Sequence, residues 1–144
     1  MKSSMNPDVG FVFDTNVLLS AFLFRGSVPR QVFDVAIQTG RLVYSDETLE
    51  ELWDVLVRPK FDRFLPLSDR VKLLEGFETI SQHVVIQSGI ELCRDPKDNK
   101  FLNLTVSANA RCIITGDKDL LELVEIAAIP IITPAQFLEK NQPV

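Results

Sequence analysis

Three acidic residues stand where a chain of alternating strands and helices would bring them to one edge of a sheet. Asp14 ends a short apolar segment, Asp98 begins a helix-like segment, and Asp117 follows another apolar segment within Thr115-Gly116-Asp117. In an open parallel sheet, ligands bind beyond the carboxyl ends of the strands. We therefore expect these carboxylates to converge at that edge.

A fourth acid is expected from a helix that begins near Ser45. Glu51 lies between Leu49 and Leu52 of an apolar stripe, so its side chain can turn inward. Glu47 lies one turn earlier on much the same side, and Glu50 is expected to be solvated. The choice between Glu51 and its two neighbours stays open at this stage.

Converging carboxylates repel each other and are costly to bury without a cation. Carboxylates without histidine or cysteine are hard oxygen ligands that suit Mg²⁺ or Mn²⁺. Two such ions about 3.5–4 Å apart can activate water and stabilise the leaving oxygen in phosphodiester hydrolysis. Taken singly, each acid is equally well explained as a helix cap or a turn residue.

The composition excludes several other classes of protein. The chain has 144 residues and a net charge of −5 from 15 basic and 20 acidic side chains, which disfavours a nucleic-acid binder that relies on bulk positive charge. Two divalent cations would remove this objection by neutralising four carboxylates.

Two cysteines, Cys93 and Cys112, are too few for a disulfide scaffold or a four-ligand zinc site. The single histidine, His83, disfavours a catalytic triad, and we expect it at a surface or an element boundary.

No apolar stretch approaches the about 20 residues that a membrane span needs, and the N-terminus lacks the apolar region of a secretory signal. We therefore expect a cytoplasmic protein that does not enter a membrane.

The elements that would position the acids alternate along the chain. Strands are expected over residues 9–13, 42–44, 84–86, 112–115 and 129–132. Helices between strands require crossover connections, which favours a parallel sheet with helices on both faces. We expect one α/β domain over residues 1–144, with a core from about 9 to 138.

Two apolar segments offer a choice between core and partner surface. Phe22-Leu23-Phe24 precedes a glycine-containing loop, and Phe61, Phe64 and Leu65 lie in the least regular stretch, 59–66. Either segment could form a dimer face or the groove for a protein partner. We expect both to be buried in the core.

Three motifs in chain order resemble those of the PIN domain family. They are Phe11-Val12-Phe13-Asp14-Thr15-Asn16-Val17-Leu18, Arg94-Asp95-Pro96-Lys97-Asp98-Asn99-Lys100-Phe101-Leu102, and Ile113-Ile114-Thr115-Gly116-Asp117-Lys118-Asp119-Leu120-Leu121. The resemblance implies a three-layer α/β/α sandwich whose central parallel sheet has five strands in the order 3-2-1-4-5. It also implies an endoribonuclease that depends on one or two Mg²⁺ or Mn²⁺ ions.

By position, the resemblance assigns the catalytic and metal-binding acids to Asp14, Glu51, Asp98 and Asp117. It places Thr15, Asn16 and Thr115 as polar residues that support those acids. Asp95 and Asp119 are further acids without an assigned role. Basic residues flank the motifs and are candidates for contacts with the RNA backbone: Arg25, Arg30, Lys97, Lys100 and Lys118.

The resemblance also implies partners, because many proteins of this general shape are toxins held silent by a small antitoxin. A homodimer is a further family-level expectation. The main alternative is a non-catalytic PIN-like module that binds RNA or protein. An aspartyl-phosphate phosphatase is disfavoured because its second acid would stand at position 16, which is Asn16 here, and a P-loop motif is absent from the sequence.

Overall fold

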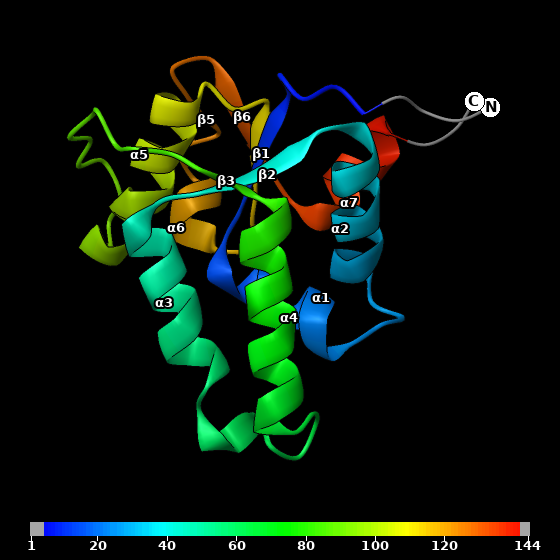
Figure 1. The fold of residues 1–144 in the computed structure, drawn as a ribbon. Helices are drawn as coiled ribbons and strands as arrows, with labels where there is room; N and C mark the ends of the chain where they lie inside the picture. Colours follow the sequence, from blue (N-terminus) through cyan, green and yellow to red (C-terminus); the bar gives the residue numbers. More distant parts are fainter. Residues whose placement is uncertain (1–4, 142–144) are drawn as a thin grey trace.

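A computed structural model of the chain describes residues 5–141, and both ends of the predicted 1–144 domain lie outside them (Figure 1). The strands are β1 (Gly10–Phe13), β2 (Arg41–Tyr44), β3 (Gln82–His83), β4 (Cys112–Ile114), β5 (Glu125–Ile126) and β6 (Ile129–Ile132). The α-helices are α1 (Thr15–Leu23), α2 (Val28–Thr39), α3 (Asp46–Leu56), α4 (Leu67–Ile80), α5 (Asn99–Ala108), α6 (Lys118–Leu121) and α7 (Pro134–Lys140). Two single-turn 3₁₀ helices are η1 (Pro59–Phe61) and η2 (Pro96–Asp98).

The strands form one sheet in the order β3-β2-β1-β4-β6-β5. All neighbouring strands are parallel except β5 and β6, which pair antiparallel. The predicted α/β/α class and the order of the five parallel strands are therefore confirmed, and β5 is an additional edge strand.

Alternating side chains of β1 divide the core between the two faces of the sheet. Phe11 and Phe13 pack with α1, α2, α4 and α7, whereas Val12 packs with α5 and α6 on the other face. Because β1 is buried on both faces, it reads in the sequence as a continuous apolar run. The resulting layers place the carboxyl ends of β1 and β4 side by side (Figure 1).

The predicted third strand over residues 84–86 is wrong in position. The pairing with β2 is made by Gln82 and His83, and the last bond to that strand is from Val84 N to Tyr44 O, at 2.8 Å. Val84 and Ile86 pack instead against the cluster that contains α5. His83 is exposed at this edge, as expected.

The segment that follows β3 runs along α5 and is held there by side chains. Ser107 Oγ accepts from Gln87 N at 2.9 Å, Asn103 Oδ1 from Ile90 N at 2.7 Å, and Asn99 Oδ1 from Cys93 N at 2.9 Å. These three acceptors are four residues apart, so they lie along one face of the helix. They fix the path of the chain into η2 and therefore the start of α5, where Asp98 lies.

The β5–β6 turn explains why β5 could not be predicted from the sequence. Ala127 and Ala128 both adopt positive φ, at 50° and 66°. Two-residue hairpin turns of this kind usually carry Asn or Gly.

Within residues 5–141, no helix combines the length and the hydrophobicity needed to cross a bilayer.

Candidate metal centre

Asp14 lies directly after β1 and is 5% exposed. Its Oδ1 accepts from Val17 N at 2.8 Å and so caps α1, while its Oδ2 accepts from the Thr115 hydroxyl. Burial raises the pKa of Asp14, the hydrogen bonds from Thr115 and Val17 lower it, and the charge of Asp117 raises it again. The residue is therefore a helix cap and a site carboxylate at once.

Thr115 joins the ends of two neighbouring strands. Its side chain is buried, and its Oγ donates to Asp14 and accepts from Asp117 N at 2.9 Å. A single hydroxyl thus fixes the carboxylate after β1 relative to the turn after β4. The resemblance assigns Thr115 to the support of the site acids, and the structure shows its bond to Asp14, while its role in a working site stays a prediction.

Three carboxylates meet beside this pair. One oxygen from each of Asp98, Asp117 and Asp119 lies within 4.8 Å of the other two. Burial, and after it the negative charges of Asp117, Asp95, Asp119 and Glu51, together raise the pKa of Asp98 to about 6. Asp98 and Asp117 were expected here, whereas Asp119 had no predicted role. The signal that could have found Asp119 is the Asp-x-Asp spacing, since Asp119 N donates to Asp117 Oδ1 at 2.8 Å.

Glu51 reaches the same edge from α3. Its Oε2 accepts from the Thr15 hydroxyl, and its Oε1 lies 2.9 Å from Lys100 Nζ. The side chains of Lys100 and Glu51 are 17% and 26% exposed, so this ion pair is only partly screened by solvent. Helices α1, α3 and α5 each contribute one member of this contact set. Glu47 and Glu50 are exposed, and the geometry favours Glu51 as the helix acid.

The predicted RNA-contacting residues divide into engaged and free side chains. Lys100 pairs with Glu51, and Arg30 Nε lies 3.1 Å from Asp34. Arg25, Lys97 and Lys118 are exposed, as is Asn16 in the first turn of α1. Lys100 is therefore placed to orient the carboxylate of Glu51.

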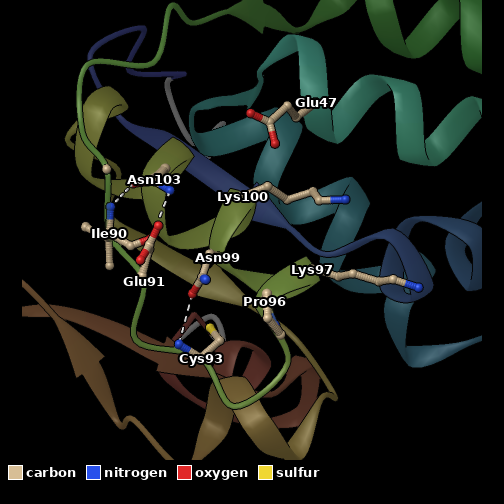
Figure 2. Close-up of a pocket in the computed structure, with 10 residues that line it drawn as sticks. Glu47, Ile90, Glu91, Cys93, Pro96, Lys97, Asn99, Lys100 and Asn103 are labelled. Atoms are coloured by element: carbon tan, nitrogen blue, oxygen red, sulfur yellow. Dashed lines mark hydrogen bonds between the residues drawn. The ribbon is translucent and has the colours of Figure 1, made fainter.

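Two neighbouring cavities open beside the acids. One of about 790 Å³ lies between Glu47 of α3 and the residues around Cys93 and the start of α5, and Figure 2 shows its lining. The second, about 320 Å³, follows α3 from Glu47 past Glu51 to Arg58. Lys97 and Lys100 line both, and in Figure 2 their side chains extend in the same direction. The open groove along α3 thus carries both charges: Arg58, Lys97 and Lys100 stand among the carboxylates of Glu47, Glu50, Glu51 and Asp54.

The donor set fits a hard divalent cation. The converging donors Asp98, Asp117 and Asp119 offer carboxylate oxygens, and the only histidine of the chain, His83, pairs with Asp46 at the β3 edge, at 2.8 Å. Burial and then the repulsion of neighbouring acids raise the pKa of Asp98, and a bound cation would offset both. Oxygen ligands of this kind suit Mg²⁺ and Mn²⁺.

Comparisons with known proteins agree with the fold and the motifs. The family model described as the PIN domain matches residues 10–119. An uncharacterized protein of Methanocaldococcus jannaschii is 31% identical over 139 residues, which cover 90% of this chain and 89% of that protein. The crystal structure of PAE2754 from Pyrobaculum aerophilum aligns with a TM-score of 0.59 at 11% identity, over 92% of this chain and 89% of that one. The structural likeness supports the fold alone.

Proposed function

The chain belongs to the PIN domain family, and from that premise we propose that it is a divalent-metal-dependent endoribonuclease that hydrolyses RNA phosphodiester bonds. PIN domains are generally metal-dependent nucleases. The observation that carries the proposal is the convergence of Asp98, Asp117 and Asp119 next to the buried Asp14. Acids gathered in this way are costly unless a cation joins them.

The proposed ligands of one or two Mg²⁺ or Mn²⁺ ions are Asp14, Asp98 and Asp117, with Glu51 completing the set directly or through water. Bound ions of this kind polarise the scissile phosphate and activate water for in-line displacement. Asp119 lies close enough to share in the coordination.

The chain's own residues would orient these ligands before substrate arrives. Thr115 holds one oxygen of Asp14, and the backbone of Val17 holds the other. Thr15 and Lys100 hold the two oxygens of Glu51. Fixed carboxylates lose little freedom when a cation binds, which favours binding and a defined substrate geometry. Exposed Lys97, in the groove wall, is placed to contact an RNA phosphate.

We further propose that the protein acts as the toxin of a toxin–antitoxin pair, with a small antitoxin as its partner, and that it forms a homodimer. This part of the proposal rests on the resemblance of the motifs. A cytoplasmic location is supported by Cys93 and Cys112, which are both free thiols, because reducing compartments keep thiols unpaired.

The decisive test is cleavage of a labelled single-stranded RNA pool with Mn²⁺, with Mg²⁺ and with EDTA. Asp14→Asn is the main variant, because an amide oxygen can still cap α1 at Val17 N while the charge is lost. Glu75→Gln, an exposed change on α4, is the matched control. We expect cleavage by wild type and the control in both metals, and a loss of at least about 100-fold in Asp14→Asn and in EDTA.

Equal cleavage by wild type and Asp14→Asn would identify a contaminating nuclease and remove the proposal. RNA binding without cleavage in any metal would favour the non-catalytic binding module instead. Calorimetric titration with Mn²⁺ separates these cases. A protein with the metal centre gives a heat of binding that Asp14→Asn abolishes, whereas a module without the centre gives none.

A further inference from the structure

We propose that the loop between α1 and α2 and the connector between α3 and α4 form a docking surface for single-stranded RNA that extends from the acidic site. This aromatic–basic surface consists of Phe24, Arg25, Lys60, Arg63 and Phe64. The inference rests on the proposed ribonuclease function and names how that site would hold a longer substrate.

The first observation is an exposed pair of aromatic rings. Phe24 and Phe64 are 43% and 42% exposed, and their ring centroids lie 5.1 Å apart at an interplanar angle of 78°. The expectation that both residues are buried is wrong, because Phe24 is the C-cap of α1 and Phe64 lies in the connector between α3 and α4, both outside the two core clusters. Phe22, by contrast, is buried as expected, and Phe61 and Leu65 are partly buried. Exposed rings offer faces on which nucleic acid bases stack with little sequence preference.

The second observation is the charge around the pair. Residues 24–30 and 57–67 contain five of the chain's 15 basic residues and one of its 20 acids. The single acid, Asp62, is bonded to Arg70, and Arg30 is bonded to Asp34. Among residues 5–141, no carboxylate forms an ion pair with Arg25, Lys60 or Arg63. This positive surface stands on a chain of net charge −5, so the concentration is local.

The third observation is that the connector is firmly built. Arg70 of α4 is fully buried, and its guanidinium donates to Leu56 O at 2.6 Å, Arg58 O at 3.0 Å and Leu65 O at 2.9 Å. It also bonds Asp62 within the connector. These bonds fix the backbone that presents Lys60, Arg63 and Phe64. The basic side chains are therefore displayed on an ordered segment, which lowers the entropy lost when they bind a ligand.

The fourth observation is continuity with the acidic site. Helix α1 begins directly after Asp14, and Asn16, Ser20 and Phe24 follow at intervals of four residues along one face. That face spans about 12 Å at 1.5 Å per residue. A strand cut at the acids can therefore continue to the aromatic–basic surface.

The chemistry favours RNA over a protein occupant. Arg63 lies over the Phe64 ring at 4.7 Å and Lys60 over the Phe61 ring at 5.2 Å, so cations interleave with rings throughout the surface. Arginine and aromatic residues are also frequent in protein–protein interfaces, but the centre of such an interface is usually depleted of lysine and of charge as a whole. Alternating rings and cations instead match the bases and phosphates of a single strand.

The test measures binding of a labelled 20-nucleotide single-stranded RNA in EDTA, where metal-dependent cleavage does not occur. In a double variant, Lys60→Gln with Arg63→Gln, we expect affinity to fall about tenfold at low salt and the slope of log affinity against log salt to decrease by about 1.4. Phe64→Ala should weaken binding by about 5- to 100-fold and leave that slope unchanged. Thermal melting checks that each variant is folded.

The matched control is Arg111→Gln with Lys140→Gln, two basic side chains around a cavity at the opposite end of the sheet. It removes the same charge and should bind as wild type does. Equal losses of RNA affinity in both double variants would show that RNA binding depends on the total charge of the protein and not on this surface, which would overturn the proposal.

Wild-type affinity in all surface variants would overturn the docking surface while the proposed cleavage activity, tested separately in Mn²⁺, still stands. A change in oligomeric state by Phe64→Ala without a change in RNA affinity would identify a protein interface instead. Wild type that neither binds nor cleaves RNA would remove both proposals.

Discussion

Side chains at the acidic site also hold local structure together. Asp14 caps α1, Asp117 caps the short α6, and Thr115 links the two. Each acid therefore accepts a backbone hydrogen bond that orients it, and in Asp14 this bond opposes the rise in pKa that burial causes. The sequence leaves the choice between cap and metal ligand open; the structure shows the capping bonds, and the role as ligands stays our proposal.

Asp98 should make the stability of the metal-free protein depend on pH. An unfolded Asp has a pKa near 3.9, whereas burial and neighbouring acids raise the pKa of Asp98 in the folded protein to about 6. The folded state then binds the proton more tightly, so this residue stabilises the fold at low pH and that contribution is lost as pH rises through 6.

Comparison of wild type with Asp98→Asn in EDTA isolates the effect. Between pH 5 and pH 7.5, the free energy of unfolding of the variant, measured with urea, should rise by roughly 1 kcal/mol relative to that of wild type. The effect is no larger because solvent screens a partly exposed group. A stability difference that stays constant over this range would contradict the assigned cause. In Mn²⁺, the higher stability of Asp98→Asn at pH 7.5 should disappear. The reason is that the bound ion stabilises the carboxylate of the wild-type protein and not the amide of the variant.

At the scale of elements, the connector between α3 and α4 depends on one buried side chain. Arg70→Met would leave the carbonyls of Leu56, Arg58 and Leu65 without this donor and Asp62 without its partner. We expect a loss of about 3–5 kcal/mol in the free energy of unfolding, measured with urea.

Two further substitutions sharpen the Arg70 experiment. Arg70→Lys keeps the charge but cannot reach several acceptors with a planar fork, so it should recover only part of the loss. Arg63→Met removes an exposed arginine from the same connector and should change stability by less than about 0.5 kcal/mol. Similar losses in Arg63→Met and Arg70→Met would contradict the role given to Arg70.

The elements also show how far the sequence could predict the fold. Buried strands β1 and β4 are continuous apolar runs, so they and the acids at their ends could be predicted. The position of strand β3 could not be predicted, because Val84 and Ile86 have the apolar pattern of a strand but pack on α5. The backbone of the segment that follows them is bonded to side chains of α5, namely Asn99, Asn103 and Ser107. Strand β5 depends on a turn at Ala127–Ala128 that has no sequence signature. The sequence predicts Lys100 only as a candidate for contact with the RNA backbone, because its pairing with Glu51 joins α5 to α3, a contact that no local pattern encodes.

At the scale of the whole molecule, a divalent cation should stabilise the protein against heat. A ligand that binds only the folded state raises the melting temperature, and a concentration 100 times the dissociation constant adds about 2.7 kcal/mol. For a domain of this size that corresponds to a rise of roughly 5–10 °C. We expect this rise when millimolar Mn²⁺ replaces EDTA, measured by calorimetry.

Asp117→Asn should abolish most of the Mn²⁺-induced rise, because Asp117 belongs to the converging carboxylates. Glu125→Gln, an exposed acid on β5, should keep the full rise and controls for general screening of negative charge. An identical rise in all three proteins would show that Mn²⁺ acts on net charge rather than at the candidate metal centre.

The bond between Thr115 and Asp14 joins residues separated by 101 positions, across two strands that are neighbours only in the finished sheet. During synthesis, β1 leaves the ribosome early and can pair with β2 on one edge. Its other edge stays unpaired until β4 has been made. The carboxylates of Asp14 and Asp117 are therefore brought together only once most of the polypeptide has been made. A nascent or truncated chain that stops before Cys112 has no assembled centre, so any activity housed there begins with the completed protein and not with its fragments.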